Sequence, residues 1–184
     1  REENQFLPDF AQLESLVKRG PRTRLLFLNY PNNPTGATAS LDFFKEVVAF
    51  AKRHEILVCH DNAYSELFFD NERQPSFLEV PGAKDVGVEI HSMSKGFDMI
   101  GWRIGWVCGN ERIVQAFSDV KDNSDSGQFM AIQRAAAVAL DTPEIPLEVK
   151  TKYERRLKKL VGALKSVGFD AKMPEGTYFL YTKS

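Results

Sequence analysis

The sequence is poor in the residues that mark several classes of protein. It has two cysteines in 184 residues, Cys59 and Cys108. Each lies within an apolar run, so we expect buried free thiols in a reducing compartment and not a disulfide or a metal pair. The three histidines, His54, His60 and His91, lack metal-ligand spacing to cysteine or carboxylate neighbours. We therefore predict no metal site.

Charge of one sign and long hydrophobic runs are also missing. The formal net charge is −1, which gives no broad attraction to nucleic acid or to an anionic membrane. The most basic stretch, residues 150–159, has helical spacing and reads as a solvated helix face. No apolar run approaches the length of a membrane span, and no signal peptide is visible. With 43% hydrophobic and 27% charged residues, the composition predicts a soluble, cytoplasmic globular protein.

The hydrophobic periodicity predicts alternating strands and amphipathic helices. This alternation is typical of an α/β fold, a mostly parallel sheet with helices on both faces. Ligands of such sheets bind beyond the carboxyl ends of the strands. We predict buried strands over residues 24–29, 56–60, 86–91 and 103–108, a further strand over 176–181, and helices over 9–19, 41–51, 110–119, 128–140 and 146–166.

The segment Ser-Met-Ser-Lys-Gly-Phe-Asp-Met-Ile-Gly-Trp-Arg, residues 92–103, carries the clearest chemical signal. The amine of Lys95 can form a Schiff base with a carbonyl. Ser92, Ser94 and Arg103 can hydrogen-bond a phosphate dianion. Pyridoxal phosphate combines both groups, so it is the cofactor that this segment indicates. The alternative is a surface lysine beside a glycine-rich turn.

Two upstream segments add polar residues that follow predicted strands. They are residues 29–36, Asn-Tyr-Pro-Asn-Asn-Pro-Thr-Gly, and residues 60–66, His-Asp-Asn-Ala-Tyr-Ser-Glu. The Asp61 carboxylate can pair with a protonated ring nitrogen and make the ring an electron sink. Asp61 could instead cap a helix. Asn33 could be a turn residue and Tyr64 a half-buried core residue.

Together the three segments resemble the signature blocks of the fold-type-I aminotransferases of class I/II. The spacings agree: 28 residues separate Asn33 from Asp61, three separate Asp61 from Tyr64, and eight separate Lys95 from Arg103. The resemblance covers residues 24–184. It implies pyridoxal phosphate, bound by Asn33, Asp61, Tyr64, Ser92, Ser94, Lys95 and Arg103, with catalytic roles for Lys95, Asp61 and Tyr64.

In this family Lys95 would hold the cofactor and then move a proton, while Tyr64 and Asn33 would hydrogen-bond the ring's phenolic oxygen. The resemblance also implies a ping-pong exchange between an amino acid and a 2-oxo acid, in a homodimer. Residues 1–145 would be part of the three-layer large domain. Residues 146–184 would be the connecting helix and the start of the small domain.

Within the family, the blocks look most like the LL-diaminopimelate aminotransferases of lysine biosynthesis, which use the glutamate/2-oxoglutarate pair. Aspartate, alanine and aromatic aminotransferases are near alternatives. A β-lyase or synthase of the same fold, or a regulatory domain without turnover, remains open. A nicotinamide-binding domain is disfavoured because no strand precedes a Gly-x-Gly-x-x-Gly turn.

The sequence departs from the family pattern at both ends. It begins at Arg1 and not at methionine, which indicates a piece of a longer protein. Family members start well before this region, and they continue past Ser184 to the arginine that binds the substrate α-carboxylate. We therefore expect that the isolated 184 residues do not transaminate.

Overall fold

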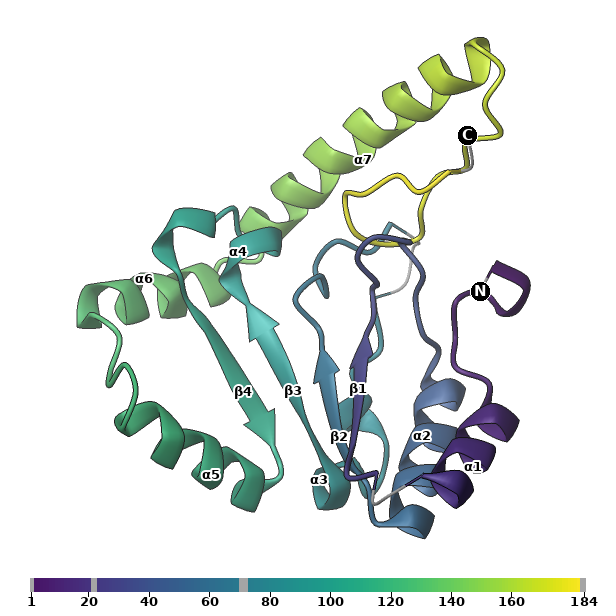
Figure 1. Ribbon diagram of the computed structural model, residues 1–184. Coiled ribbons are helices and arrows are strands. Elements are labelled where there is room, and N and C mark those ends of the chain that lie inside the picture. Colours follow the sequence, from purple (N-terminus) through teal and green to yellow (C-terminus); the bar gives the residue numbers. More distant parts are fainter. Residues whose placement is uncertain (1, 21–22, 70–72, 183–184) are drawn as a thin grey trace.

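The computed structural model describes residues 2–20, 23–69 and 73–182. Within these ranges, helices and strands alternate along most of the chain (Figure 1). The helices are η1 Glu2–Asn4, α1 Phe10–Arg19, α2 Leu41–His54, η2 Phe77–Glu79, α3 Ala83–Val86, α4 Met93–Gly96, η3 Ile100–Trp102, α5 Glu111–Asp122, α6 Met130–Leu140 and α7 Glu144–Ser166.

The described strands form one sheet in the order β1-β2-β3-β4. Their bounds are β1 Leu25–Asn29, β2 Leu57–Asp61, β3 Gly87–Ser92 and β4 Gly105–Gly109. β1 and β3 each pair with β2 in parallel, whereas β4 runs antiparallel to β3 and aligns Gly105 with Ser92. The first residue of β4 therefore lies at the edge where the first three strands end.

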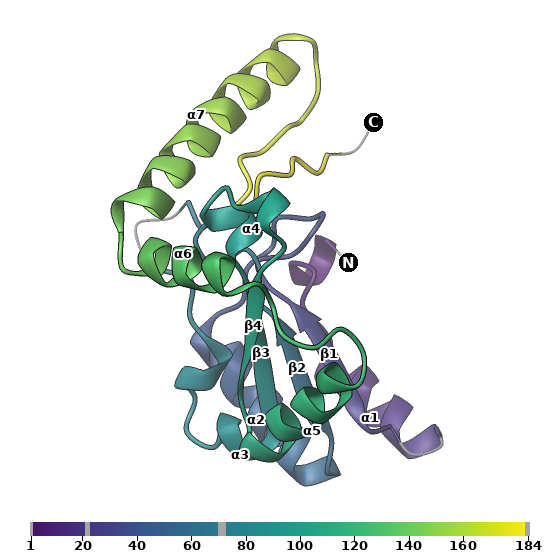
Figure 2. The same cartoon turned by 90° about the vertical axis from the view of Figure 1, so that its left-hand side faces the viewer.

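The core lies between the sheet and α2. Ser40 begins this helix by accepting the Phe43 N–H at 3.1 Å, which satisfies one of the donors left free at a helix start. Apolar residues at helical spacing then face the sheet. Phe44, Val47 and Ala51 are fully buried against strand residues that include Leu28 and Val58. The α/β fold with helices on both sheet faces is confirmed, since α5 lies across the sheet from α2 (Figure 2).

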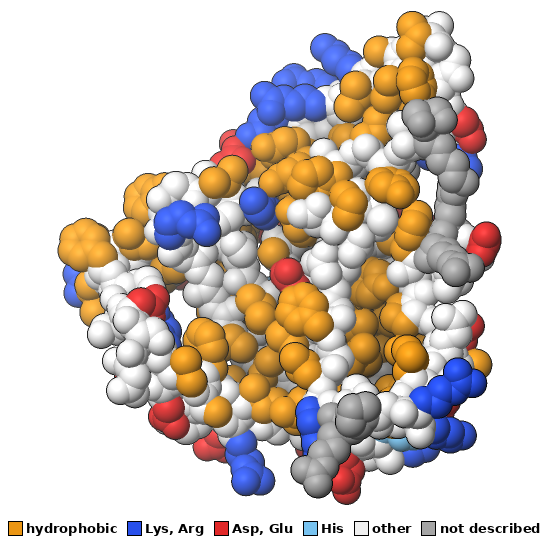
Figure 3. Space-filling view, viewed as in Figure 1, with side chains coloured by type: hydrophobic (Ala, Val, Ile, Leu, Met, Phe, Trp, Pro, Cys, Tyr) orange, Lys and Arg blue, Asp and Glu red, His pale blue; other side chains and the backbone are white. Residues whose placement is uncertain are grey.

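The second face of the sheet is only partly covered. Leu25 and Phe27 on β1 are 56% and 57% exposed, and Leu57 on β2 is 45% exposed. Hydrophobic side chains spread over this part of the surface (Figure 3). The strands therefore alternate between buried and exposed positions. The prediction of strands buried on both faces is wrong for β1 and β2 in this chain, because α5 covers the sheet beside β3 and β4.

The C-terminal segment returns to the sheet edge after α7. Gly176 N–H donates to Gly36 O at 3.1 Å, and Thr177 N–H donates to Leu67 O at 2.8 Å. The strand predicted over residues 176–181 is wrong. The segment makes an isolated bridge between Phe68 and Gly176 because its hydrogen bonds go to two different loops, so no ladder forms.

The other predicted elements are present, with ends that shift by a few residues. β2 extends to Asp61, β4 begins at Gly105, and α7 begins at Glu144, before Pro146. Cys59 and Cys108 are free and half-buried. In the described ranges, no helix combines the length and apolar character that a bilayer span requires. No group of three or more His, Cys, Asp or Glu side chains in these ranges is arranged to hold a metal ion.

Candidate active site

The predicted site residues lie along one edge of the sheet. Asp61 and Ser92 end β2 and β3, and Arg103 lies two residues before β4. Lys95 lies in α4, the short helix that follows β3 directly, and Asn33 lies in the loop after β1. The antiparallel direction of β4 brings Arg103 to the edge where the parallel strands end (Figure 1).

Asn29, the last residue of β1, connects two of these residues. Its side-chain N–H donates to Asp61 O at 3.1 Å, and its side-chain oxygen accepts the Asn33 N–H at 2.9 Å. The Asp61 Oδ1 atom accepts the Ala63 N–H at 3.2 Å, which holds the turn toward Tyr64. Asn29 is not among the predicted site residues. Its place at the start of the segment 29–36, next to a strand end, was the available signal.

Tyr64 is 5% exposed and lies beside Asn33, whose Nδ2 donates to the phenolic oxygen at 3.5 Å. Burial raises the pKa of the Tyr64 phenol well above its ordinary value of 10.0. Tyr178 and the Asp61 carboxylate raise that pKa further, and the Asn33 amide lowers it slightly. Tyr64 therefore keeps its proton at neutral pH and can donate a hydrogen bond.

Tyr178 contacts both Tyr64 and Lys95, and sequence reasoning missed it. Its ring centroid lies 5.7 Å from that of Tyr64, nearly perpendicular to it, and the Lys95 Nζ lies 5.9 Å from its centroid. A cation at this distance from an aromatic face is attracted to it. The segment Pro-Glu-Gly-Thr-Tyr-Phe-Leu was recognised only as the start of another domain. Its return to the loops after β1 and β2 could not be read from local patterns.

The Lys95 and Arg103 segments contact each other through Ser94. Ser92 begins α4 by accepting the Ser94 N–H at 3.1 Å. The Arg103 guanidinium donates to Ser94 Oγ at 3.5 Å and to Ile100 O at 2.8 Å. Arg103 has φ +51°, a left-handed conformation that is uncommon outside glycine. This conformation sets the direction in which its side chain leaves the backbone. The structure thus brings hydroxyls and a guanidinium together beside Lys95, a grouping suited to an anion.

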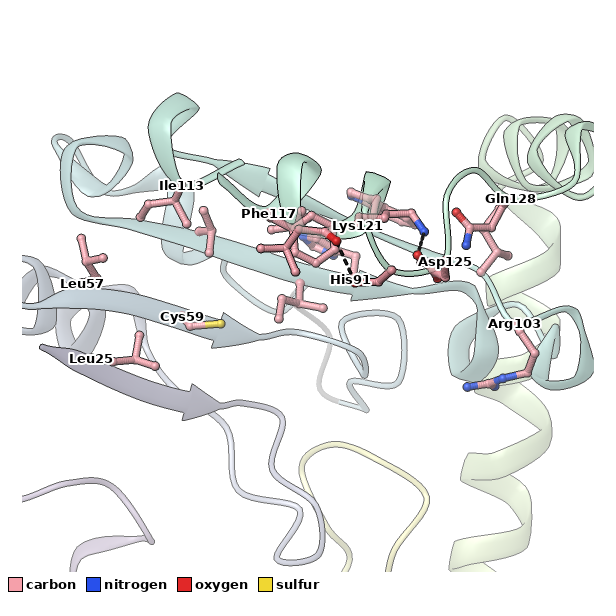
Figure 4. Close-up of a pocket in the computed structure, with 18 of the residues that line it drawn as sticks. Leu25, Leu57, Cys59, His91, Arg103, Ile113, Phe117, Lys121, Asp125 and Gln128 are labelled. Carbon is pink, nitrogen blue, oxygen red and sulfur yellow. Dashed lines mark hydrogen bonds and ion pairs between the residues drawn. The ribbon is translucent and has the colours of Figure 1, made fainter. Parts of the chain in front are cut away.

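A cavity of ≈ 660 Å³ lies elsewhere, between α5 and the partly covered face of the sheet (Figure 4). Of the predicted site residues, only Arg103 lines it, at the end opposite Leu25 and Leu57. Its lining is mostly aliphatic and aromatic, and Lys95, Asp61 and Tyr64 are not among the lining residues. The sheet edge is therefore the better candidate for chemistry.

Comparison with known proteins agrees with this arrangement. The profile of the aminotransferase class I and II family matches residues 1–184. The chain is 54% identical over 183 residues to the LL-diaminopimelate aminotransferase of Methanocaldococcus jannaschii, and 47% identical over 179 residues to that of Moorella thermoacetica. It spans 43% and 45% of these two relatives, and the matches cover 100% and 97% of this chain.

Solved structures show the same fold. BacF from Bacillus subtilis aligns with a TM-score of 0.93 at 39% identity, over 100% of this chain and 49% of its own. An aromatic aminotransferase from Pyrococcus horikoshii aligns with a TM-score of 0.85 at 28% identity, over 96% of this chain and 48% of its own. With a family profile that matches along its whole length, the chain belongs to the class I and II aminotransferases.

Proposed function

We propose that this chain is part of a pyridoxal-phosphate-dependent aminotransferase and contributes most of its cofactor site. The observation that carries the proposal is the meeting of Lys95, Asp61, Tyr64 and Arg103 at one sheet edge. An amine, a carboxylate, a protonated phenol and a guanidinium with hydroxyls match the chemical groups of the cofactor: an aldehyde, a ring nitrogen, a phenolic oxygen and a phosphate. The donor set therefore fits pyridoxal phosphate.

When bound, pyridoxal phosphate supplies a ring that accepts the electron pair left on an amino acid after loss of its α-proton. Asp61 would hold the proton on the ring nitrogen, because a carboxylate stabilises the cationic form. Tyr64 and Asn33 would donate to the phenolic oxygen. Lys95 Nζ would bond the aldehyde carbon and, once released by the substrate amine, carry the proton from the substrate Cα.

Ser92, Ser94 and Arg103 would bind the phosphate. Arg103 already donates to Ser94 Oγ at 3.5 Å, so a phosphate oxygen placed beside this hydroxyl would meet two donor groups at once. The exposed position of Arg103 leaves its guanidinium open to such an anion. Because Asp61 ends β2 and Arg103 precedes β4, with β3 between these strands, the anion would bind on the other side of β3 from the Asp61 carboxylate.

We further propose that the substrates are LL-diaminopimelate and the glutamate/2-oxoglutarate pair. The support is the shared name of relatives that are 54% and 47% identical along this chain. A homodimer remains a prediction from the resemblance, and a cytoplasmic location remains a prediction from the sequence composition. Because the chain spans less than half of these relatives, we also propose that the 184 residues alone do not transaminate. Residues 1–145 would be part of the cofactor-binding domain, and residues 146–184 would lead into the next domain.

Borohydride trapping tests the cofactor proposal. The full-length protein is mixed with pyridoxal phosphate, reduced and digested, and the modified peptide is identified by mass spectrometry. We expect the cofactor on Lys95 and its loss in Lys95→Ala. Lys45→Ala, at an exposed lysine of α2, is the matched control and should leave the labelling unchanged. Cofactor attached to another lysine, or to none, would refute the proposal.

Single-turnover spectroscopy tests the substrate proposal. We expect LL-diaminopimelate and glutamate to convert the bound cofactor to its amine form, whereas aspartate and phenylalanine react more slowly. Release of pyruvate together with ammonia from an amino acid that carries a leaving group on Cβ, with the cofactor left in its aldehyde form, would instead identify a β-lyase of the same fold.

A further inference from the structure

His60 and Glu89 form a fully buried pair beneath the candidate site. They are register partners on β2 and β3, and they are 0% and 1% exposed. The His60 Nδ1 lies 2.8 Å from the Glu89 Oε1. Ionisable side chains are rarely fully buried, because removing their charges from water is costly. This pair therefore needs a structural explanation.

The backbone neighbour of His60 determines the protonation of one of its two ring nitrogens. The His60 Nε2 lies 3.0 Å from Tyr30 O, and a backbone carbonyl can only accept a hydrogen bond. Nε2 must therefore carry a proton. The charge of the imidazole then depends on whether Nδ1 also carries one, and Nδ1 faces the Glu89 carboxylate.

Glu89 is surrounded by donors. It accepts the Ser76 O–H at 2.6 Å and the Phe77 N–H at 2.7 Å, and the His91 Nε2 lies 3.3 Å from its second oxygen. Burial raises the pKa of the Glu89 carboxyl, but the hydrogen bonds from His60, His91 and Ser76 outweigh burial and hold this pKa below its ordinary value. The Ser76 O–H and the Phe77 N–H both donate to Glu89, so the geometry assigns Glu89 as the acceptor and the His60 Nδ1 that faces it at 2.8 Å as a donor. Both ring nitrogens of His60 then donate, Nδ1 to Glu89 and Nε2 to Tyr30 O.

This ion pair links the strand ends that lead to the site. Tyr30 directly follows β1 and precedes Asn33, and His60 directly precedes Asp61. Glu89 lies in β3, whose end leads into the helix of Lys95. Replacing a buried ion pair by an apolar pair of similar volume is often neutral or stabilising. An apolar pair at this position would leave the Tyr30 carbonyl and the Phe77 amide without their partners. The hydrogen-bonded pair therefore fixes the positions of these two backbone groups.

We propose that His60 and Glu89 are positioning residues: their buried ion pair holds the loop of Asn33, the carboxylate of Asp61 and the helix of Lys95 in the arrangement that receives the cofactor. The inference rests on the proposed function. It adds two residues that do not touch the cofactor and act through the backbone of β1, β2 and β3.

Two substitutions and their combination test the proposal in the full-length protein. Glu89→Gln keeps the shape of the side chain. Its amide oxygen can still accept the Phe77 N–H, but it carries no negative charge, so its contact with the His60 Nδ1 weakens. His60→Gln keeps one donor for the Tyr30 carbonyl and removes the ion pair. His54→Gln is the matched control, because His54 pairs with Glu14 at 3.0 Å on α2 and α1, away from the site.

The readout is the apparent Kd for pyridoxal phosphate, measured from the visible circular dichroism of the bound cofactor at a temperature where each variant is folded. We expect each single substitution to raise Kd about tenfold, as loss of a residue that orients a ligand-binding group does. The double variant should also stay near tenfold and not reach about a hundredfold, because both substitutions remove one interaction. His54→Gln should bind as the parent protein does.

Three results separate the possible failures. Unchanged Kd in Glu89→Gln and His60→Gln, together with weakened binding in Asp61→Asn, would overturn the positioning role and leave the proposed function standing. Unchanged binding in Asp61→Asn and Lys95→Ala would overturn the proposed function itself. If the His60 variant does not fold, nitrogen NMR of the parent decides: two protonated ring nitrogens on His60 support the ion pair, and a single one overturns it.

Discussion

Gly96 offers a direct test of how closely the segment of Lys95 packs against the segment of Tyr64. A Cβ added at Gly96 would lie 2.4 Å from the Glu66 Cβ and 2.7 Å from its Cγ. Carbon atoms normally approach to about 3.5 Å, so Gly96→Ala must separate the two segments by about 1 Å. Rotation of the Glu66 side chain does not relieve the contact, because its Cβ is attached to the main chain. Gly96 follows Lys95, and Glu66 lies two residues after Tyr64, so the separation moves these two groups apart.

The magnitude follows from that displacement. Overpacking of this kind costs about 1–3 kcal/mol of stability. A misplacement of about 1 Å between a reacting group and its partners reduces turnover about 100-fold. We therefore expect Gly96→Ala in the full-length protein to lower kcat for transamination about 100-fold and to lower the urea midpoint. Stopped-flow absorbance of the bound cofactor with glutamate measures the first quantity.

Two further variants make the test specific. Gly101→Ala is the matched control, because an added Cβ there meets no atom within 4 Å, and its kcat should stay within about twofold of the parent. Adding Glu66→Gly to Gly96→Ala removes the opposing Cβ. The kcat of this double variant should be at least about tenfold higher than that of Gly96→Ala. A Gly96→Ala protein with parental turnover, or a double variant without any recovery, would refute the packing argument.

Three more predictions address the core, the pH dependence and the anion site. Phe44→Ala should destabilise the fold by about 3–5 kcal/mol in urea unfolding, because Phe44 is 0% exposed at the centre of the core. Burial raises the pKa of Tyr30 from 10.0 to about 12, so its stabilising contribution is complete below pH 10 and is lost as the pH rises toward 12; Tyr30→Phe should lose less stability between pH 9 and pH 11 than the parent. Arg103→Lys should weaken pyridoxal phosphate binding about tenfold, because an ammonium cannot bind the phosphate bidentately. An equilibrium titration and a competition with inorganic phosphate measure this loss of affinity.

The sequence predicts the positions of the helices and strands better than it predicts which parts of the sheet the helices cover. Helical spacing places α2 and α7 to within a few residues, and the strand that leads to Asp61 is read from its apolar run alone. Such a run cannot tell whether both sheet faces are covered by the same chain. The exposed fractions of Leu25 and Phe27 follow from the limited reach of α5, which is a tertiary property.

The same contrast holds within the site. Lys95, Asp61 and Arg103 are identified by residue type and spacing, and strand ends place them at one edge. Tyr178 and the His60–Glu89 pair were missed for physical reasons. Tyr178 reaches the site through a long return of the chain after α7. Glu89 interrupts an apolar strand, and only the register of β2 and β3 shows that His60 lies opposite it.

The reversed direction of β4 has a mechanical consequence. A parallel β4 would need a long crossover from β3, usually through a helix, and that helix could shift relative to the sheet. The antiparallel pair instead joins the two strands through residues 93–104, which include α4 and η3, and the Ser92–Gly105 pairing closes this connection at both ends. The Lys95 amine and the Arg103 guanidinium therefore lie on one connection between two paired strands. A rigid-body displacement of this unit would therefore leave the spacing between the Lys95 amine and the Arg103 guanidinium unchanged.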